Sequence, residues 1–176
     1  RRATSVCLML RYTWITFAVI ILDQLTKLAA ENLLTLYSPV SVIPGFNFTL
    51  VYNTGAAFSF LSDAGGWQKW FFILLAFGVS IGIIIWLKIQ KDDNRSRWMA
   101  IALCLVMGGA LGNAIDRLVY DHVIDFLDFY YSRYHWPAFN VADIAISVGA
   151  GLLIIQELFF LRKQNSEHEH SENDKS

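Results

Sequence analysis

Carboxylates are the side chains of this chain whose type and spacing most clearly suggest chemistry. Two carboxylates held about 3 Å apart cannot both ionise, so they share one proton, and one serves as a base while the other serves as an acid. Such a pair activates water for peptide hydrolysis with neither a metal nor a nucleophilic side chain. The spacing offers Asp143 together with one of Asp116, Asp125 or Asp128. The residues alone leave that choice open, and they leave open a transport role for the same carboxylates.

The candidate carboxylates lie at or beyond one end of the chain's long apolar segments. Ionisable groups at bilayer depth are costly and face a polar interior, so these positions indicate a polar cluster inside a bundle. The acidic residues on this side are Asp23, Glu31, Asp63, Asp116, Asp121, Asp125, Asp128 and Asp143.

The first apolar segment carries a possible ion pair, and the third carries two small residues at helical spacing. Asp23 and Lys27 are four residues apart, so an ion pair within one helix is as reasonable as a contact with substrate. Gly108 and Gly112 are also four apart, and this spacing permits close approach of a neighbouring helix.

Amide side chains precede two of the carboxylates by three residues. Asn113 precedes Asp116, and Asn140 precedes Asp143, so each pair lies on one face of a helix. Ser147 continues the second face, which indicates a stripe facing the bundle interior.

Four transmembrane helices are expected to position these groups. The chain has 176 residues, of which 55% are hydrophobic and 16% charged, a balance that favours a lipid environment. A formal net charge of -1 gives no broad cationic field for nucleic acid, so we expect no nucleic-acid partner. The apolar runs predict helices at about 12–30, 68–87, 98–115 and 141–161. We expect one integral membrane domain over 1–163 and a disordered cytoplasmic tail over 164–176.

Basic residues predict the orientation of the bundle. Ten of the 14 Lys and Arg residues lie at the two termini and in the short segment between the second and third helices. Because Lys and Arg accumulate on the cytoplasmic side, both termini are expected there, with the carboxylates near the outer leaflet.

The two segments on the outer side have patterns of their own. Residues 46–53 alternate apolar and polar side chains, which predicts a half-buried strand. Residues 123–131 are apolar but carry two carboxylates, so we expect an amphipathic segment against the membrane surface, either a short helix or extended. The fold class is therefore an all-α membrane protein with a small β segment on its outer face.

Three other readings compete with a carboxylate pair. A proton-coupled transporter would use Asp23 and Asp143, although carriers place their sites near the midplane. A serine-lysine hydrolase would pair Lys27 with Ser59 or Ser62. A metallohydrolase would use ligand types suited to zinc, namely His122, Asp125, His135 and Asp143.

Five blocks of the sequence resemble the signature blocks of bacterial lipoprotein signal peptidase, also called type II signal peptidase, in the order of that family. They are 23–27 (DQLTK), 53–58 (NTGAAF), 108–117 (GGALGNAIDR), 123–126 (VIDF) and 139–143 (FNVAD). The resemblance implies an aspartic membrane endopeptidase whose catalytic pair is Asp125 and Asp143. It implies no cofactor and no metal.

The resemblance also implies a substrate and a location. The family removes the signal peptide of prolipoproteins, cutting before a cysteine to which a diacylglyceryl transferase has already attached lipid. We therefore expect a monomer in the bacterial inner membrane, in contact with membrane lipids. Residues implied to bind substrate or brace the site are Asp23, Lys27, Asn53, Gly55, Gly108, Asn113, Asp116, Arg117 and Asn140.

Overall fold

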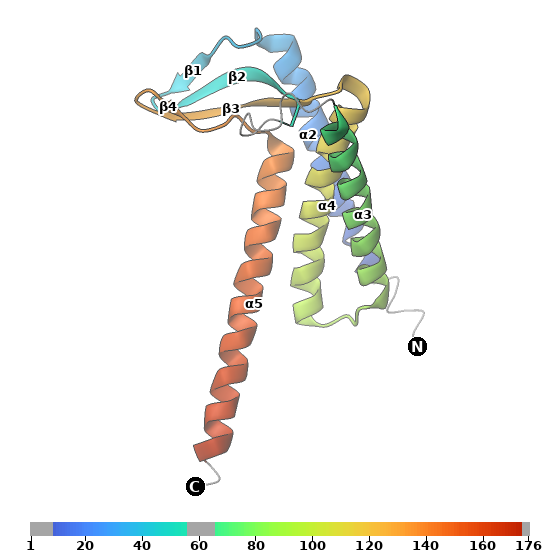
Figure 1. Cartoon of the computed structure of the whole chain (residues 1–176). Coiled ribbons are helices and arrows are strands. Elements are labelled where there is room, and N and C mark those ends of the chain that lie inside the picture. The colour runs from blue at the N-terminus through green and yellow to red at the C-terminus, as the bar shows by residue number, and fades with distance from the viewer. Residues whose placement is uncertain (1–8, 56–65, 174–176) are drawn as a thin grey trace.

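Four long helices and a small sheet make up the computed structural model, which describes residues 9–55 and 66–173 (Figure 1). The helices are α2 (Thr13–Leu33), α3 (Trp67–Ile89), α4 (Asn94–Tyr120) and α5 (Val141–Asn173). All four contain windows long and apolar enough to cross a membrane. This confirms the expected class, a helical membrane protein with a small β segment at one end.

Helix α4 is the central element, since it contacts α2, α3 and α5. Small residues permit this packing. A Cβ added to Gly108 would lie 2.7 Å from the Cβ of Val19 on α2, and one added to Gly109 would lie 2.3 Å from the carbonyl oxygen of Ala142 on α5. Larger residues at either position would push the helices apart.

Two helices are longer than their apolar runs. Helix α4 starts at Asn94 because the Asp93 side chain accepts a hydrogen bond from the backbone N–H of Ser96 at 2.8 Å and caps the helix. Helix α5 continues to Asn173, so residues 164–173, expected from the sequence to be disordered, are helical. That polar stretch contains neither Gly nor Pro, so nothing in it ends a helix that has already begun.

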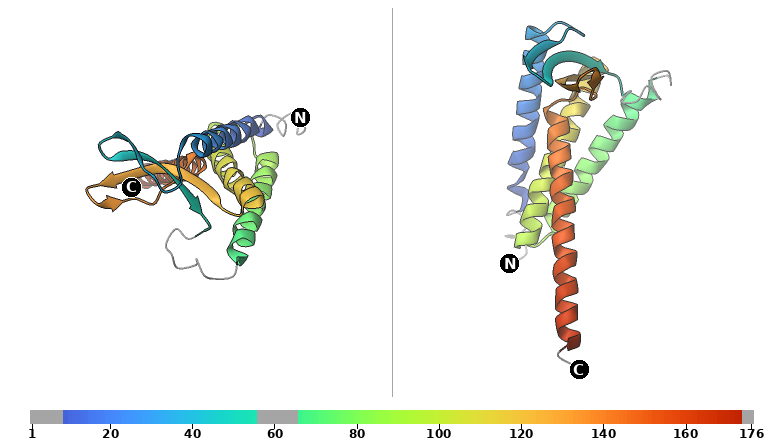
Figure 2. Two further views of the ribbon diagram at one scale, coloured as in Figure 1. Left: turned by 90° about the horizontal axis from the view of Figure 1, so that it is seen from above. Right: turned by 90° about the vertical axis from the view of Figure 1, so that its left-hand side faces the viewer.

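The sheet is antiparallel, with the order β1-β2-β3-β4, and projects to one side of the bundle (Figure 2). Its strands are β1 (Val40–Ile43), β2 (Phe46–Asn53), β3 (Val123–Tyr131) and β4 (Tyr134–His135). The predicted strand at 46–53 is confirmed with the same bounds. Residues 123–131, expected as a short helix or an extended segment, form β3 because β2 offers it a partner edge.

One irregularity marks the pairing of the two central strands. Phe48 lies opposite Leu127, whereas Val51 lies opposite Asp125, so two residues of β2 span a single residue of β3. This β-bulge bends the strand beside the position of Asp125. Strand β3 is anchored on its other face, where Ile124 and Phe126 form a buried cluster with Ala30 and Leu50. The strand is therefore fixed between α2 and β2.

Candidate active site

Asp125 is buried on β3 with both of its carboxylate oxygens occupied. Its side chain is 2% exposed. Oδ1 accepts a hydrogen bond from Asn140 Nδ2 at 2.7 Å, and Oδ2 accepts one from Asn53 Nδ2 at 3.0 Å. Asn53 is held in this orientation because its own Oδ1 accepts from the backbone N–H of Gly55 at 2.9 Å. The carboxyl group is therefore fixed from both sides by amides.

Asp143 occupies the first turn of α5, in a reciprocal cap with Asn140. The Asp143 backbone N–H donates to Asn140 Oδ1 at 3.0 Å, and the Asn140 backbone N–H donates to Asp143 Oδ2 at 3.3 Å. This is the arrangement of a capping box, which satisfies two backbone donors at a helix start. The remaining oxygen, Oδ1, accepts from Asn113 Nδ2 at 2.8 Å. Asn140 thus contacts both Asp125 and Asp143 and holds them near each other.

The amide of Asn113 has its direction set by a buried cation. Its Oδ1 accepts from Lys27 Nζ at 2.9 Å and from Asn140 Nδ2 at 3.1 Å, so its Nδ2 is left to donate to Asp143. An ammonium group can only donate. Lys27 therefore fixes which end of Asn113 faces the carboxylate.

Lys27 is itself held by two carboxylates beneath the site. Its Nζ lies 2.8 Å from Asp23 Oδ2 and 2.7 Å from Asp116 Oδ2, and the residue is only 1% exposed. Gln24, which the sequence did not single out as a site residue, donates to Asp116 Oδ1 at 2.8 Å. In the sequence, its position next to Asp23 in the first helix could have indicated that Gln24 belongs to the same polar cluster.

The same cluster attaches α5 to the other helices. Asp23 Oδ1 accepts from the backbone N–H of Ala142 at 2.9 Å, so a carboxylate on α2 satisfies a free donor of the first turn of α5. The approach is tight, because a Cβ on Gly112 would lie 2.7 Å from Asp23 Oδ2. By contrast, Gly108 packs against α2 at Val19, and its contacts are with helix atoms and not with Asp125 or Asp143.

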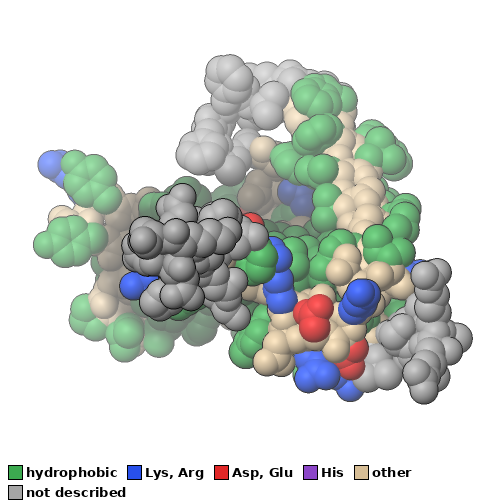
Figure 3. All heavy atoms as spheres, turned by 90° about the horizontal axis from the view of Figure 1, so that it is seen from below, with side chains coloured by type: hydrophobic (Ala, Val, Ile, Leu, Met, Phe, Trp, Pro, Cys, Tyr) green, Lys and Arg blue, Asp and Glu red, His purple; other side chains and the backbone are tan. Residues whose placement is uncertain are grey.

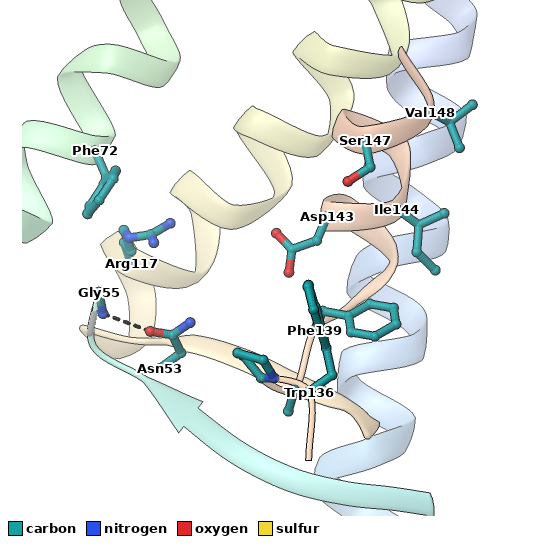
Figure 4. A pocket seen from close by; sticks show the side chains of 12 residues that line it. Asn53, Gly55, Phe72, Arg117, Trp136, Phe139, Asp143, Ile144, Ser147 and Val148 are labelled. Carbon is teal, nitrogen blue, oxygen red and sulfur yellow. Dashed lines mark hydrogen bonds between the residues drawn. The ribbon is translucent and has the colours of Figure 1, made fainter. Parts of the chain in front are cut away.

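A cleft of about 620 Å³ opens beside these residues (Figure 4). Arg117 stands at one side, where its guanidinium carbon lies 4.7 Å from the centre of the Phe72 ring and Nη1 donates to the Asn113 carbonyl oxygen at 3.1 Å. Asp143 is one of the lining residues, whereas Asp125 is not. The lining residues are Asn53, Gly55, Phe72, Arg117, Trp136, Pro137, Ala138, Phe139, Asp143, Ile144, Ser147 and Val148.

The surroundings of Asp125 favour its protonated form. Burial raises its pKa to about 7, and the nearby Asp143 carboxylate adds to the increase, against the hydrogen bonds from Asn53 and Asn140. A carboxyl group that keeps a proton near neutral pH can act as a general acid.

Asp128 lies three residues along β3 and therefore on the opposite face of the strand. Its Oδ2 accepts from Asn47 and Thr49, both at 3.1 Å, and its Oδ1 lies 2.8 Å from His135 Nδ1. Burial opposes ionisation, but the hydrogen bonds, that of His135 foremost, outweigh it and hold the pKa of Asp128 below its usual range. The structure therefore brings Asp125, and not Asp128, to Asp143.

Among the described residues, those required by the metallohydrolase reading are not assembled. His135 contacts Asp128, while the His122 ring lies 4.1 Å from that of Tyr52. Within residues 9–55 and 66–173, no group of three or more His, Cys, Asp or Glu side chains is arranged to hold a metal ion. The candidate nucleophiles Ser59 and Ser62 lie outside the described residues, as does Asp63.

The fold and the cluster together define a class: a multi-pass membrane protein with two linked carboxyl groups at one end of a helical bundle. The family model described as signal peptidase (SPase) II matches residues 15–159. The chain belongs to the signal peptidase II family, whose members are aspartic membrane peptidases.

Relatives and solved structures agree with this assignment. The chain is 53% identical over 146 residues to the lipoprotein signal peptidase of Alteromonas mediterranea, covering 83% of this chain and 79% of the relative. It is 47% identical over 163 residues to that of Pseudomonas putida, covering 92% and 93%. A solved bacterial membrane enzyme superposes with a TM-score of 0.72 at 32% identity, covering 84% of this chain and 87% of that one.

Proposed function

We propose that Asp125 and Asp143 are the catalytic pair with which this member of the signal peptidase II family hydrolyses the bond before the lipid-modified cysteine of a prolipoprotein. The observation that carries the proposal is the bridge made by Asn140, which donates to Asp125 through its side chain and to Asp143 through its backbone. The bridge keeps two carboxyl groups together at the edge of an open cleft.

The chemistry proposed for the pair is general acid-base hydrolysis by water. Asp125, whose pKa of about 7 leaves it largely protonated in slightly acid solution and about half protonated at neutral pH, donates to the oxygen of the scissile carbonyl as negative charge develops there. Asp143, which lines the cleft, removes a proton from the attacking water. When the tetrahedral intermediate collapses, Asp143 donates its proton to the leaving amine and Asp125 regains one from a hydroxyl of the intermediate, so the pair again holds one proton.

The other predicted residues act by holding this pair in place. Asp125 is oriented by Asn140 and by Asn53, and Gly55 holds Asn53 in place. Asp143 is oriented by Asn113. Lys27 directs Asn113, and Asp23 and Asp116 neutralise Lys27 inside the bundle. Arg117 closes one side of the cleft, and Gly108 brings α2 against α4 so that the cluster can form. These are the positions implied as substrate-binding or bracing residues: Asp23, Lys27, Asn53, Gly55, Gly108, Asn113, Asp116, Arg117 and Asn140.

The cleft continues along the membrane-spanning helices, where the apolar signal segment of a substrate would lie. A second cavity of about 300 Å³ shares Phe72 and Arg117 with the cleft. It is otherwise lined mainly by apolar side chains of α3, α4 and α5, namely Leu75, Ala76, Val79, Val106, Ala110 and Ile146, with Asn113. This groove supports entry of an apolar helix from the bilayer.

The lipid on the substrate fits a site at this depth. Each buried methylene of an acyl chain contributes about 0.8 kcal/mol to membrane binding, so a diacylglyceryl group holds the adjoining peptide at the bilayer surface. The enzyme would therefore act after a diacylglyceryl transferase, on a bond already delivered to the cleft. One chain supplies every side chain used here, so a monomer suffices.

We propose an inner-membrane location with the site near the outer leaflet and both termini in the cytoplasm. Lys and Arg side chains gather at the end of the molecule opposite the sheet (Figure 3), where Arg95 pairs with Glu157 and Arg97 with Asp92. Such an excess of basic residues marks the cytoplasmic side. Labelling of single cysteines with a membrane-impermeant reagent in intact cells would test this orientation.

The function is tested with a synthetic prolipoprotein peptide in two forms, with and without the diacylglyceryl group on its cysteine. Purified enzyme is expected to cleave the lipidated form before the cysteine and to cleave the bare form far more slowly. Equal rates would show that cleavage does not depend on the lipid. Cleavage of neither form, by protein shown to be folded, would overturn the proposed function.

A further inference from the structure

Ser147 lies one helical turn from Asp143 and faces the same cleft. The two residues are four apart on α5, and Figure 4 shows the hydroxyl and the carboxylate pointing into the cavity from the same side of the helix. Ser147 is exposed, and its neighbours in the cleft wall, Ile144 and Val148, are apolar. It is therefore a hydroxyl group placed in an apolar wall of a membrane-spanning helix.

The amide and charged side chains of the cleft, Asn53, Arg117 and Asp143, already have partners. Asn53 donates to Asp125 and accepts from Gly55, and Arg117 donates to the Asn113 carbonyl. Among the residues that the structure describes, Ser147 makes no hydrogen bond, not even to the carbonyl one turn back on α5. Its hydroxyl remains available to a molecule in the cleft.

A peptide substrate in the cleft needs a hydrogen-bonding group at the depth of Ser147. The segment before the cut belongs to an apolar signal helix, which must become extended to bring its scissile bond to Asp143. Extension breaks helical hydrogen bonds, and the freed peptide groups find no water in the hydrocarbon region. A peptide group buried without a partner costs on the order of several kcal/mol. Only a polar group of the protein can replace the lost bond there.

The direction of α5 identifies which part of the substrate passes Ser147. The helix starts beside the sheet and runs away from it along the bundle (Figure 1), so Ser147 lies about 6 Å along the helix axis from Asp143, toward the membrane interior. The signal segment lies on that side of the scissile bond, and the lipidated cysteine lies on the other.

We propose that the Ser147 hydroxyl binds the peptide backbone of the substrate in the extended segment just before the scissile bond. This assignment rests on the proposed function, because it concerns how the same site holds its peptide. Ser147 is a substrate-binding residue in this role, and it takes no part in the proton transfers of Asp125 and Asp143.

The first test compares Ser147→Ala with wild-type enzyme on the lipidated peptide. Loss of one hydrogen bond to the substrate is expected to lower kcat/KM about tenfold. Alanine is the best helix former, so the variant should fold, which its thermal unfolding checks. Ser80→Ala is the matched control, because it removes a hydroxyl that is buried on α3 and bonds the Ala76 carbonyl. It should keep kcat/KM within about twofold of wild type.

The second test changes the substrate, using peptides in which one backbone amide at a time is replaced by an ester. One ester before the scissile bond is expected to slow the wild-type enzyme and to have less than about a twofold effect on Ser147→Ala, because the two changes remove the same bond. The inference would be overturned if Ser147→Ala kept the wild-type kcat/KM. It would also be overturned if the loss from every ester position multiplied with the loss from Ser147→Ala. Wild-type cleavage of the all-amide peptide keeps either result separate from failure of the proposed function.

Discussion

The two faces of strand β3 give similar carboxylates opposite behaviour. Asp125 and Asp128 are three residues apart, both are buried, and each accepts a hydrogen bond from an Asn of β2, Asn53 in one case and Asn47 in the other. On the inward face, neutral amides and a second carboxyl surround Asp125, and its pKa rises to about 7. On the outward face, His135 and Thr49 join Asn47, and the pKa of Asp128 falls.

Two differences separate the carboxyl groups: loss of hydration on burial is the main influence on the pKa of Asp125, whereas hydrogen bonds and a cationic partner outweigh burial at Asp128. Asp128 has a partner that can carry positive charge and enough donors to replace its hydration, so ionisation is favoured. Asp125 has one amide donor on each oxygen and faces Asp143, so ionisation would place two negative charges in a region of low dielectric. The fold uses Asp128 to fasten β2 and β4 to β3, and it keeps Asp125 able to hold a proton.

The largest difference in activity is expected between Asn substitutions of the proposed catalytic carboxyls and of Asp128 on the opposite face of β3. Asp125→Asn and Asp143→Asn should each lower kcat/KM for the lipidated peptide by roughly 10³-fold or more, because each removes one partner of the acid-base pair. Asp128→Asn should stay within about threefold of wild type. Circular dichroism and thermal unfolding check that all three variants are folded. A strong loss in Asp128→Asn with the fold intact would remove the contrast.

The two asparagines of β2 provide a smaller contrast of the same kind. Asn53→Ala removes a donor to Asp125, so a tenfold to hundredfold fall in kcat/KM is expected, on the order of one bond to a charged group. Because that hydrogen bond favours the ionised form, its loss should also raise the pKa of Asp125 and shift the alkaline limb of the pH profile upward. Asn47→Ala should leave the pH profile unchanged. A shifted profile in Asn47→Ala would contradict the separation of the two faces.

The substitutions Asp125→Asn and Asp128→Asn should change the unfolding temperature in opposite directions. The folded-state pKa of Asp125 is raised, so the folded protein loses stability as the pH rises from the ordinary carboxyl pKa through about 7. Asp125→Asn should therefore raise the unfolding temperature at pH 8 and change it less at pH 5. The pKa of Asp128 is lowered, so its contribution is present above the ordinary pKa and is lost in acid. Asp128→Asn should lower the unfolding temperature at both values, as differential scanning fluorimetry would show.

The smallest expected effect is that of metal removal. The described residues hold no cluster of three or more metal-ligand side chains, and the proposed chemistry uses none. Dialysis against a chelator should leave kcat/KM unchanged for wild type and for Asp128→Asn. Loss of activity that zinc restores would favour the competing metallohydrolase.

The sequence predicted the elements of this structure better than their pairing. Hydropathy indicated the four spanning helices, and alternation gave β2 at 46–53, because both signals are local. The form of residues 123–131 stayed open, since their conformation depends on hydrogen bonds to a strand more than 70 residues earlier in the chain. Spacing could not separate Asp125 from Asp128 for the same reason: the choice depends on which face of β3 is turned toward α5.

The resemblance to a family supplied what local patterns could not. It implied Asp125 and Asp143 as the pair, and the structure links both to Asn140. Gln24 was missed as a member of the network because its partner Asp116 is 92 residues away on another helix. The polar stretch 164–173 was expected to be disordered because composition does not reveal whether a preceding helix continues into it.

If Asp125 must hold a proton for the reaction to proceed, the pH dependence of kcat/KM for the lipidated peptide will show it. We expect kcat/KM to fall as the pH rises through about 7, when Asp125 ionises beside Asp143. Asp128→Asn should show the same alkaline limb. A kcat/KM that increases through pH 7, as expected for a histidine or lysine base, or that stays constant to pH 9, would contradict the account.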